Sequence, residues 1–145
     1  MRESIKKLPG FKKVGFIRRS EAGEIQLLSI EGSFPRDAAV YALAVDDEVR
    51  YIGAAESLAR RLSSYRRRQV TDSSKRPIHQ EMHDALSNHE IQIFAFIITR
   101  RPIHFDGLPI DPLTGIESGL IMALKPIWNR RGAVFTAEAP TISPN

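Results

Sequence analysis

The chain has 145 residues, of which 42% are hydrophobic and 26% are charged, a composition that predicts a single folded domain with its own core. It contains no cysteine, which excludes disulfides and thiolate metal sites and favours a reducing compartment. No apolar run is long enough to cross a membrane, and no apolar stretch follows the charged start, MRESIKKLPG, as it would in a signal peptide. We therefore expect a cytoplasmic protein.

The basic residues are unevenly placed along the chain, although the formal net charge is only +4. Seven lysines and arginines lie between Leu58 and Arg76 against one acid, Asp72, whereas acids collect between Glu21 and Glu56. A basic stripe of this kind is typical of proteins that bind a polyanion such as nucleic acid. A solvated surface rich in lysine and arginine is the simpler alternative.

The first part of the chain predicts two pairs of strands. Residues 12–19 and 24–32 flank the turn sequence SEAG and predict a hairpin, after which Pro35 interrupts the chain. Residues 39–45, AVYALAV, and 49–54, VRYIGA, predict a second pair joined by a three-residue turn.

The second pair of strands brings two tyrosines together. If Val45 lies opposite Val49, Tyr41 lies opposite Gly53, and Tyr51 becomes a diagonal neighbour of Tyr41 on the same face. We expect Gly53 to leave open space at the strand end, where a backbone or a ligand could approach.

The rest of the chain predicts helices around one more strand. Residues 56–69 predict a helix because Leu58, Leu62 and Tyr65 recur at i, i+4 and i+7. Residues 77–89 predict a second helix, with a proline near its first position.

The final third of the chain predicts a buried strand, a loop and a helix. Residues 91–99 form a continuous apolar run that predicts a strand buried on both faces. Residues 99–115 contain three prolines and two glycines and predict a long loop. Residues 116–126 predict a helix ended by Pro126.

Arg61 is the first candidate for chemistry on the predicted helix. It lies at the margin of the buried stripe, with Arg68 on the same flank, whereas Arg60 and Arg67 point away. A short connection from the strand would bring Arg61 beside Tyr51, and a guanidinium suits phosphate oxygens. The alternative is that the tyrosines are core aromatics and Arg61 is a surface residue.

His79 and His83 are four residues apart and would share a helical face. Their spacing lacks the glutamate position of metalloproteases, and no third ligand is evident. We expect a polar helix face here rather than a zinc site.

Several short motifs, in this order and at these spacings, resemble the GIY-YIG nuclease family. AVY, YIG and SLARRLSSY resemble its first half, most closely in the catalytic domain of bacterial excision-repair nucleases. ESGLIMALKPIWN, with Glu117, Pro126 and Asn129, resembles its distal motif. The resemblance covers about residues 38–131. It implies an α+β fold in which a small central antiparallel sheet is flanked by helices.

The resemblance also implies roles for individual residues. Tyr51 would act as general base or orient the attacking water, with Tyr41 hydrogen-bonded nearby. Arg61 would contact the scissile phosphate, and Glu117 would be the single carboxylate that binds a metal. Tyr65 and Asn129 match positions beside the family's site and would contact nucleic acid or support the site. The basic run adds Arg60, Arg66, Arg67 and Arg68 as candidate nucleic-acid contacts.

The sequence departs from the family pattern at two positions. Ala39 replaces a glycine in the first motif, which costs little in an ordinary strand. Ala54 stands where the repair nucleases have a lysine, so that charge is missing or is supplied by Arg60 or Arg68.

The domains and the function follow from this resemblance. We expect an N-terminal extension with a hairpin at 1–37, a GIY-YIG-like catalytic domain at 38–135 and a flexible tail at 136–145. The leading hypothesis is a metal-dependent DNA endonuclease, a phosphodiester hydrolase using Mg²⁺ or Mn²⁺, with one metal because one carboxylate is available. Glu117 could instead be a helix N-terminal acid that interacts with the helix dipole.

Other functions stay open at this point. The chain could be a DNA-binding module of the same fold without cleavage, or a metal-independent protein-interaction domain. Restriction, repair and mobile-element nucleases all fit, and a restriction enzyme would be expected to form a homodimer. The N-terminal hairpin and the 99–115 segment are where a sequence reader or a dimer contact could lie.

Overall fold

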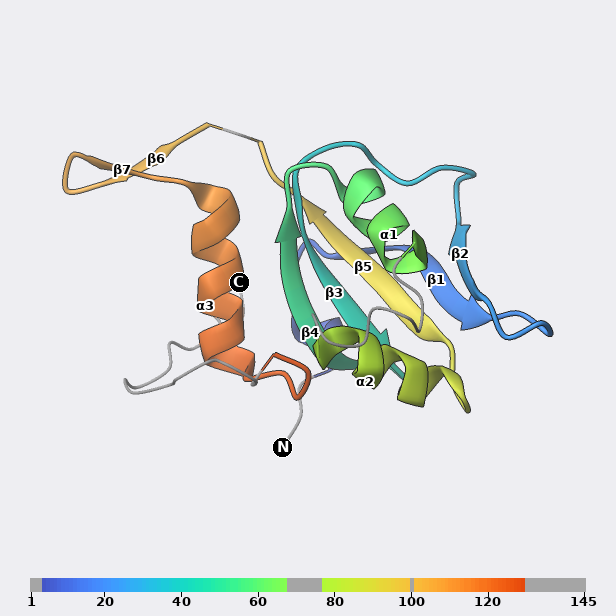
Figure 1. The fold of residues 1–145 in the computed structure, drawn as a ribbon. Helices are drawn as coiled ribbons and strands as arrows, with labels where there is room; N and C mark the ends of the chain where they lie inside the picture. Colours follow the sequence, from blue (N-terminus) through green and yellow to red (C-terminus); the bar gives the residue numbers. More distant parts are fainter. Residues whose placement is uncertain (1–3, 68–76, 100, 130–145) are drawn as a thin grey trace.

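The computed structural model describes residues 4–67, 77–99 and 101–129. Within these ranges the chain forms a five-stranded antiparallel sheet with helices on both faces, which confirms the predicted α+β class (Figure 1). The elements are β1 (Lys12–Arg19), β2 (Ile25–Ser29), β3 (Ala39–Val45), β4 (Glu48–Ala55), α1 (Leu58–Arg67), α2 (Pro77–Leu86), β5 (Ile91–Ile97), β6 (Ile103–Phe105), β7 (Leu108–Ile110) and α3 (Pro112–Leu124), with a short 3₁₀ turn at Ile5–Lys7.

The strand order in the main sheet is β2-β1-β5-β3-β4. The predicted N-terminal hairpin forms as β1 and β2, and β1 also pairs with β5, so the hairpin is part of the main sheet. The predicted boundary at residue 37 stays a prediction, and the predicted tail at 136–145 lies outside the described residues.

The β3–β4 hairpin has the predicted register at its tyrosines but a shorter turn. Tyr41 lies opposite Gly53 and Leu43 lies opposite Tyr51, as predicted. The turn contains two residues, Asp46 and Asp47, both with positive φ, rather than the predicted three. A bulge after Leu43 compensates for this difference and keeps the tyrosines on one face.

Two separate cores cover the two faces of the sheet. On one face α1 and α2 pack their apolar residues against alternate positions of the strands, including Leu43 and Ile93. On the other face α3 packs against the intervening positions, including Val40 and Ile52. Because both faces are covered, β3 is buried along its whole length, and β5 contributes residues to both cores, as predicted.

The segment predicted as a loop between 99 and 115 is instead a third hairpin followed by the start of a helix. Strands β6 and β7 pair across a two-residue turn in which Asp106 and Gly107 have positive φ. Helix α3 then begins at Pro112, where Asp111 accepts a hydrogen bond from the backbone N–H of Leu113 as its N-cap.

Helix α3 ends close to the predicted position. Its last residue is Leu124, and Lys125 adopts the left-handed conformation just before Pro126. None of the helices in the described ranges is long and apolar enough to span a membrane.

Candidate active site at the outer edge of strand β4

Three tyrosines from β3, β4 and α1 form a continuous aromatic cluster. The ring centroids of Tyr41 and Tyr51 are 6.1 Å apart, and those of Tyr41 and Tyr65 are 6.4 Å apart. The hydroxyls of Tyr41 and Tyr65 form a hydrogen bond with each other inside the core. Tyr41 and Tyr65 are fully buried, whereas Tyr51 is half-buried. Tyr51 is therefore the ring of this cluster that can reach a bound molecule.

Gly53 makes room for the Tyr41 ring. A Cβ added at Gly53 would lie 2.5 Å from Cζ and 2.6 Å from the hydroxyl oxygen of Tyr41. The prediction of open space at Gly53 is therefore wrong, because the ring of Tyr41 on the neighbouring strand occupies that space. The glycine of the YIG motif allows Tyr41 to lie flat on β4, next to Tyr51.

The ionisation of Tyr41 is fixed by its surroundings. Burial raises the pKa of the Tyr41 hydroxyl well above its ordinary value, and Tyr65 and Tyr51 shift this pKa in the same direction. The positive charge of Arg61 opposes these effects by lowering the pKa, so Arg61 lies within electrostatic reach of the cluster. Tyr41 is therefore a neutral hydroxyl at physiological pH.

Arg61 is half-buried on the first turns of α1, where its backbone N–H donates to the carbonyl of Ser57. Its charge acts on two groups that belong to opposite sides of the sheet. It lowers the pKa of Tyr41, which lies in the core under α1, and it lowers the pKa of Glu117, which lies on α3. The Arg61 guanidinium thus influences the pKa of a hydroxyl in the aromatic cluster, Tyr41, and that of the carboxyl group of Glu117.

Glu117 is half-buried in the middle of α3. Burial raises the pKa of its carboxyl group, while Arg61 and a backbone hydrogen bond from Ala54 lower it. Because α3 begins at Pro112, Glu117 is too far along the helix to be an N-terminal acid, so the helix-dipole alternative is wrong. The hydrogen bond to Ala54 attaches the carboxylate to the end of β4.

Strand β4 is the outer strand of the described sheet, and residues from α3 onward cover its outward backbone groups. Asn129 accepts from the N–H of Ile52 at 2.8 Å and donates its own amide N–H to the carbonyl of Ile52 at 2.9 Å. The backbone N–H of Trp128 donates to the carbonyl of Arg50 at 2.8 Å. This arrangement agrees with a supporting role for Asn129, whose amide oxygen and nitrogen both bind the strand.

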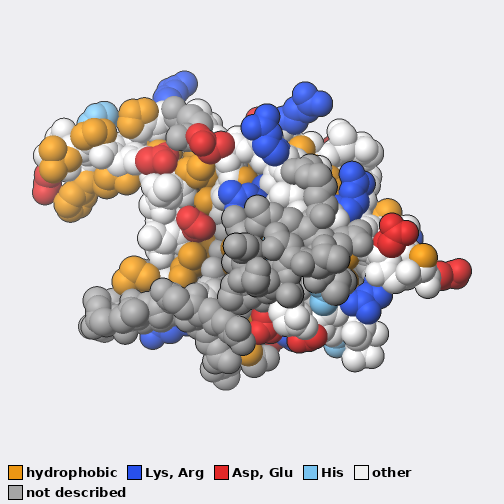
Figure 2. All heavy atoms as spheres, in the orientation of Figure 1, with side chains coloured by type: hydrophobic (Ala, Val, Ile, Leu, Met, Phe, Trp, Pro, Cys, Tyr) orange, Lys and Arg blue, Asp and Glu red, His pale blue; other side chains and the backbone are white. Residues whose placement is uncertain are grey.

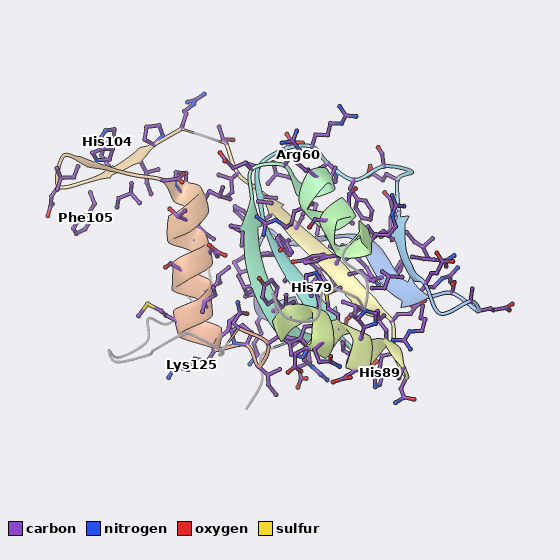
Figure 3. All side chains as sticks on the ribbon, in the orientation of Figure 1. Arg60, His79, His89, His104, Phe105 and Lys125 are labelled. Carbon is purple, nitrogen blue, oxygen red and sulfur yellow. The ribbon has the colours of Figure 1, made fainter. Side chains whose placement is uncertain are left out.

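The predicted nucleic-acid contacts divide into three groups. Arg60 and Arg66 are exposed, and Arg60 points away from the core (Figure 3). The side chain of Arg67 and the whole of Arg68 lie outside the described residues. Tyr65 is fully buried, so direct contact with nucleic acid does not fit this structure, and its hydroxyl contacts Tyr41 instead.

The prediction that α2 presents a polar face at His79 is wrong, because this side chain is buried on the side of the helix that packs into the core. Its ring packs edge-on against Tyr65, with 5.6 Å between centroids, so it extends the aromatic cluster inward. His79 lies three residues before the core residue Met82, and this spacing indicates that the two side chains share the apolar face of α2. His83 lies at the exposed end, with its Nδ1 3.2 Å from the guanidinium of Arg19.

The donor set suits magnesium better than zinc. The described residues contain no group of three or more His, Cys, Asp or Glu side chains that could hold a metal ion. A half-buried carboxylate such as that of Glu117 fits Mg²⁺, which keeps most of its waters and takes few protein ligands. Structural and catalytic zinc sites need more side chains than this.

Known proteins resemble this chain in structure. No family model and no curated protein matches it. A mutant of EndoII from bacteriophage T4, with one glutamate changed to alanine, has a TM-score of 0.69 and 25% sequence identity, covering 88% of this chain and 98% of that one. Restriction endonuclease HPY188I, solved in complex with product DNA, has a TM-score of 0.53 and 14% identity, covering 78% of this chain and 72% of that one. The chain therefore has the nuclease fold that these structures share.

Proposed function

We propose that this protein is a metal-dependent DNA endonuclease of the GIY-YIG type, which hydrolyses phosphodiester bonds. The observation that carries the proposal is that Arg61 lies within electrostatic reach of both Glu117 and Tyr41, and that the ring of Tyr51 lies 6.1 Å from that of Tyr41. A hydroxyl that can contact water, a cation for phosphate and an acid for a metal are the groups that this hydrolysis needs. The likeness to T4 EndoII supports the same assignment.

Arg61 would hold the non-bridging oxygens of the scissile phosphate. Its planar fork can donate two parallel hydrogen bonds to a phosphate, which fixes the orientation of the group as well as its place. Its partial burial excludes some of the water that would otherwise screen the charge.

Tyr51 would orient the attacking water or accept its proton. A tyrosine with an ordinary pKa of about 10 is a poor base near neutral pH, so this role requires a nearby cation that favours the phenolate. Arg61 is the candidate for that cation. Tyr41 and Tyr65 are too deeply buried to touch substrate and would position the Tyr51 ring from behind.

Glu117 would hold Mg²⁺ or Mn²⁺. When bound, the metal would neutralise charge on the phosphate and on the departing oxygen. The protein's own contribution is to keep Glu117 ionised despite its partial burial, through Arg61 and the backbone of Ala54. Because burial raises the pKa of Glu117, we expect metal affinity and cleavage to fall as the pH is lowered toward that pKa.

DNA would be held by the exposed basic residues of α1. Arg60 and Arg66 lie on its solvent side, and Arg67 and Arg68 continue the basic run in the sequence. These charges would also supply the positive charge of the lysine that the repair nucleases have at the position of Ala54. Binding should weaken steeply with salt, because each contacted phosphate releases counterions.

A plasmid assay tests the proposal directly. Supercoiled plasmid is incubated with Mg²⁺, with Mn²⁺ and without metal, using wild-type protein and the Glu117→Ala and Tyr51→Phe variants. We expect metal-dependent nicking by the wild type, and a loss of about a hundredfold or more in the Glu117→Ala variant with DNA binding retained. The matched control is Glu21→Ala, which removes an exposed acid from the β1–β2 turn and should leave the rate unchanged.

The same assay defines the outcomes that oppose the proposal. Salt-dependent DNA binding without cleavage by any variant would favour the alternative, a DNA-binding module of this fold. An unchanged rate and pH profile in the Tyr51→Phe variant would remove the role given to Tyr51.

A further inference from the structure

The β6–β7 hairpin projects away from the body of the protein between β5 and α3 (Figure 1). Its two strands pair with each other and form a separate two-stranded sheet in the described part of the chain. An isolated hairpin of this size is marginally stable in water unless another surface packs against it. Its outer edges also leave backbone groups available for further pairing.

The side chains of this hairpin are unusually apolar for a projecting element. The exposed fractions are 55% for Ile103, 67% for Phe105, 69% for Leu108 and 38% for Ile110. Ile97, at the end of β5, is 46% exposed and continues this surface onto the body. Figure 2 shows hydrophobic side chains covering the hairpin, and Figure 3 shows Phe105 pointing into solvent. Together they expose roughly 500 Å² of apolar residues, as much as the largest patch of a typical monomer.

The charges of the hairpin argue against nucleic acid as its partner. In the sequence of residues 100–111, the two cations Arg100 and Arg101 are balanced by the two carboxylates Asp106 and Asp111, with His104 between them. A surface that binds the phosphate backbone needs several uncompensated lysines or arginines, which here lie on α1 instead. The hairpin therefore suits an apolar protein surface.

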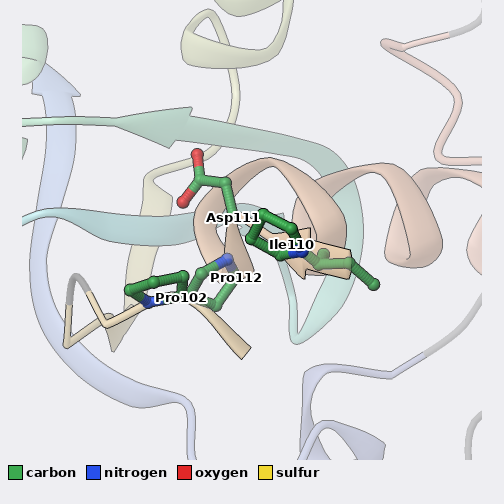
Figure 4. A pocket seen from close by; sticks show the side chains of 5 residues that line it. Pro102, Ile110, Asp111 and Pro112 are labelled. Carbon is green, nitrogen blue, oxygen red and sulfur yellow. The ribbon is translucent and has the colours of Figure 1, made fainter. Parts of the chain in front are cut away.

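The body of the same chain offers such a surface at the base of the hairpin. A hollow of about 580 Å³ is lined by Phe96, Ile97, Ile98, Thr99, Arg101, Ile103, Pro112 and Ile116. A second hollow of about 330 Å³ lies among Pro102, Pro109, Ile110, Asp111 and Pro112 (Figure 4). The first hollow is mainly apolar, whereas the second is half polar. The chain thus carries both an apolar tip and an apolar hollow beside it, which is the self-complementary arrangement that a two-fold axis requires.

We infer that the β6–β7 hairpin is an arm through which two copies of this chain associate, with Phe105 and Leu108 of each copy buried against the other. The roughly 500 Å² that the apolar residues of the arm and Ile97 expose in each copy is more than half of the roughly 800 Å² per partner that a stable interface buries. A second copy is favoured over an unrelated protein because this chain supplies both halves of the contact.

The arm is also joined directly to the candidate active site. Residue Asp111 ends the hairpin and caps α3, and α3 carries Glu117. If the proposed function holds, the paired arms would fix the distance between two cleavage centres, one for each strand of a duplex. This consequence rests on the proposed function, whereas the association itself does not.

Sedimentation equilibrium of the full chain, without DNA or metal, tests the arm. We expect the wild type to associate reversibly to a dimer at micromolar concentrations. Phe105→Ser and Leu108→Ser should each weaken the association by about tenfold or more, because central aromatic and aliphatic anchors dominate such contacts. The matched control is Ile30→Ser, which changes a similarly exposed apolar residue, 53% exposed, after β2 and should leave the association unchanged.

Two results would overturn the inference. One is a wild-type protein that stays monomeric at concentrations on the order of 100 μM, well above the range of specific dimers. The other is association that both arm variants retain at wild-type strength. Circular dichroism melting at a concentration below that of dimer formation should show unchanged stability in the arm variants, because both side chains are mainly exposed in the single chain. Plasmid nicking is measured separately, so a dimer that does not cleave contradicts the proposed function alone, and a monomer that cleaves contradicts the arm alone.

Discussion

Changing Gly53 to alanine should destabilise the protein through one steric contact. The added Cβ would lie 2.5 Å from Cζ of Tyr41, whereas ordinary carbon contacts are 3.4 Å or longer. The Tyr41 ring would have to move by about 1 Å, yet it is fully buried and bonded to Tyr65. Gly53 does not have a positive φ, so backbone strain adds nothing to this effect.

The size of the effect follows from known costs of overpacking. Forcing extra carbon into a close-packed core costs about 1–3 kcal/mol. For a domain of this length, that free energy corresponds to a fall of roughly 3–10 °C in the melting temperature. The displaced Tyr41 ring should also disturb Tyr51, so the cleavage rate at a temperature where the variant is folded should fall as well.

The chain offers a matched control for the same chemical change. A Cβ added at Gly119, in the interior of α3, would meet nothing within 4 Å. Gly119→Ala should therefore stabilise the protein by about 0.5–1 kcal/mol, because alanine is the better helix residue. Thermal and urea unfolding of both variants against wild type measure the difference. A Gly53→Ala variant as stable as wild type would refute the packing of Tyr41 over β4.

Three further substitutions test other parts of the site. Glu117→Gln should be more stable than wild type at neutral pH, because burial raises the pKa of Glu117 and its ionisation therefore costs folding free energy above that pKa. The difference should vanish below about pH 4, where the wild-type carboxyl is neutral in the folded and the unfolded state. Melting curves across this pH range check it. Asn129→Ala removes both hydrogen bonds to Ile52 and should cost about 1–3 kcal/mol, with faster hydrogen exchange at the Ile52 amide; an unchanged exchange rate would contradict the edge contact. Tyr65→Phe leaves the buried Tyr41 hydroxyl without its partner and should cost about 1 kcal/mol in urea unfolding, whereas equal stability would argue against this hydrogen bond.

Local sequence signals were sufficient for the hairpin that carries the tyrosines. A slip by one residue would move the large side chains Tyr41 and Leu43 from the core under α1 and α2 into the opposite core, which takes Val40 and Ala42 from this strand. That constraint kept Tyr41 opposite Gly53 even though the turn is one residue shorter than predicted. The bulge compensates for the shorter turn, and no residue of this hairpin predicts the bulge from the sequence.

The β6–β7 hairpin was missed because its prolines outweighed its turn signal. Asp106 and Gly107 form the Asp-Gly pair that favours a two-residue hairpin turn, and both adopt positive φ. Proline is tolerated at Pro109 because β7 pairs with β6 on one side only in the described residues, so an N–H on its outer side is not needed. The same error made the predicted helix start too late, at residue 116, because Pro112 begins α3 rather than interrupting a loop.

The position of Glu117 relative to Arg61 depends on tertiary structure that no local pattern contains. Arg61 follows β4 on one face of the sheet, and Glu117 belongs to the helix on the other face. The charge of Arg61 can influence Glu117 because β4 is an outer strand of the described sheet, so groups from both faces lie near its edge. The outward backbone groups that such an edge leaves open are used by Asn129, Trp128 and Glu117 itself. The contacts that protect the strand from pairing with another chain therefore also fix the carboxylate of Glu117 at the end of β4, so a substitution that loosens this edge should lower both stability and, if the proposed function holds, the cleavage rate.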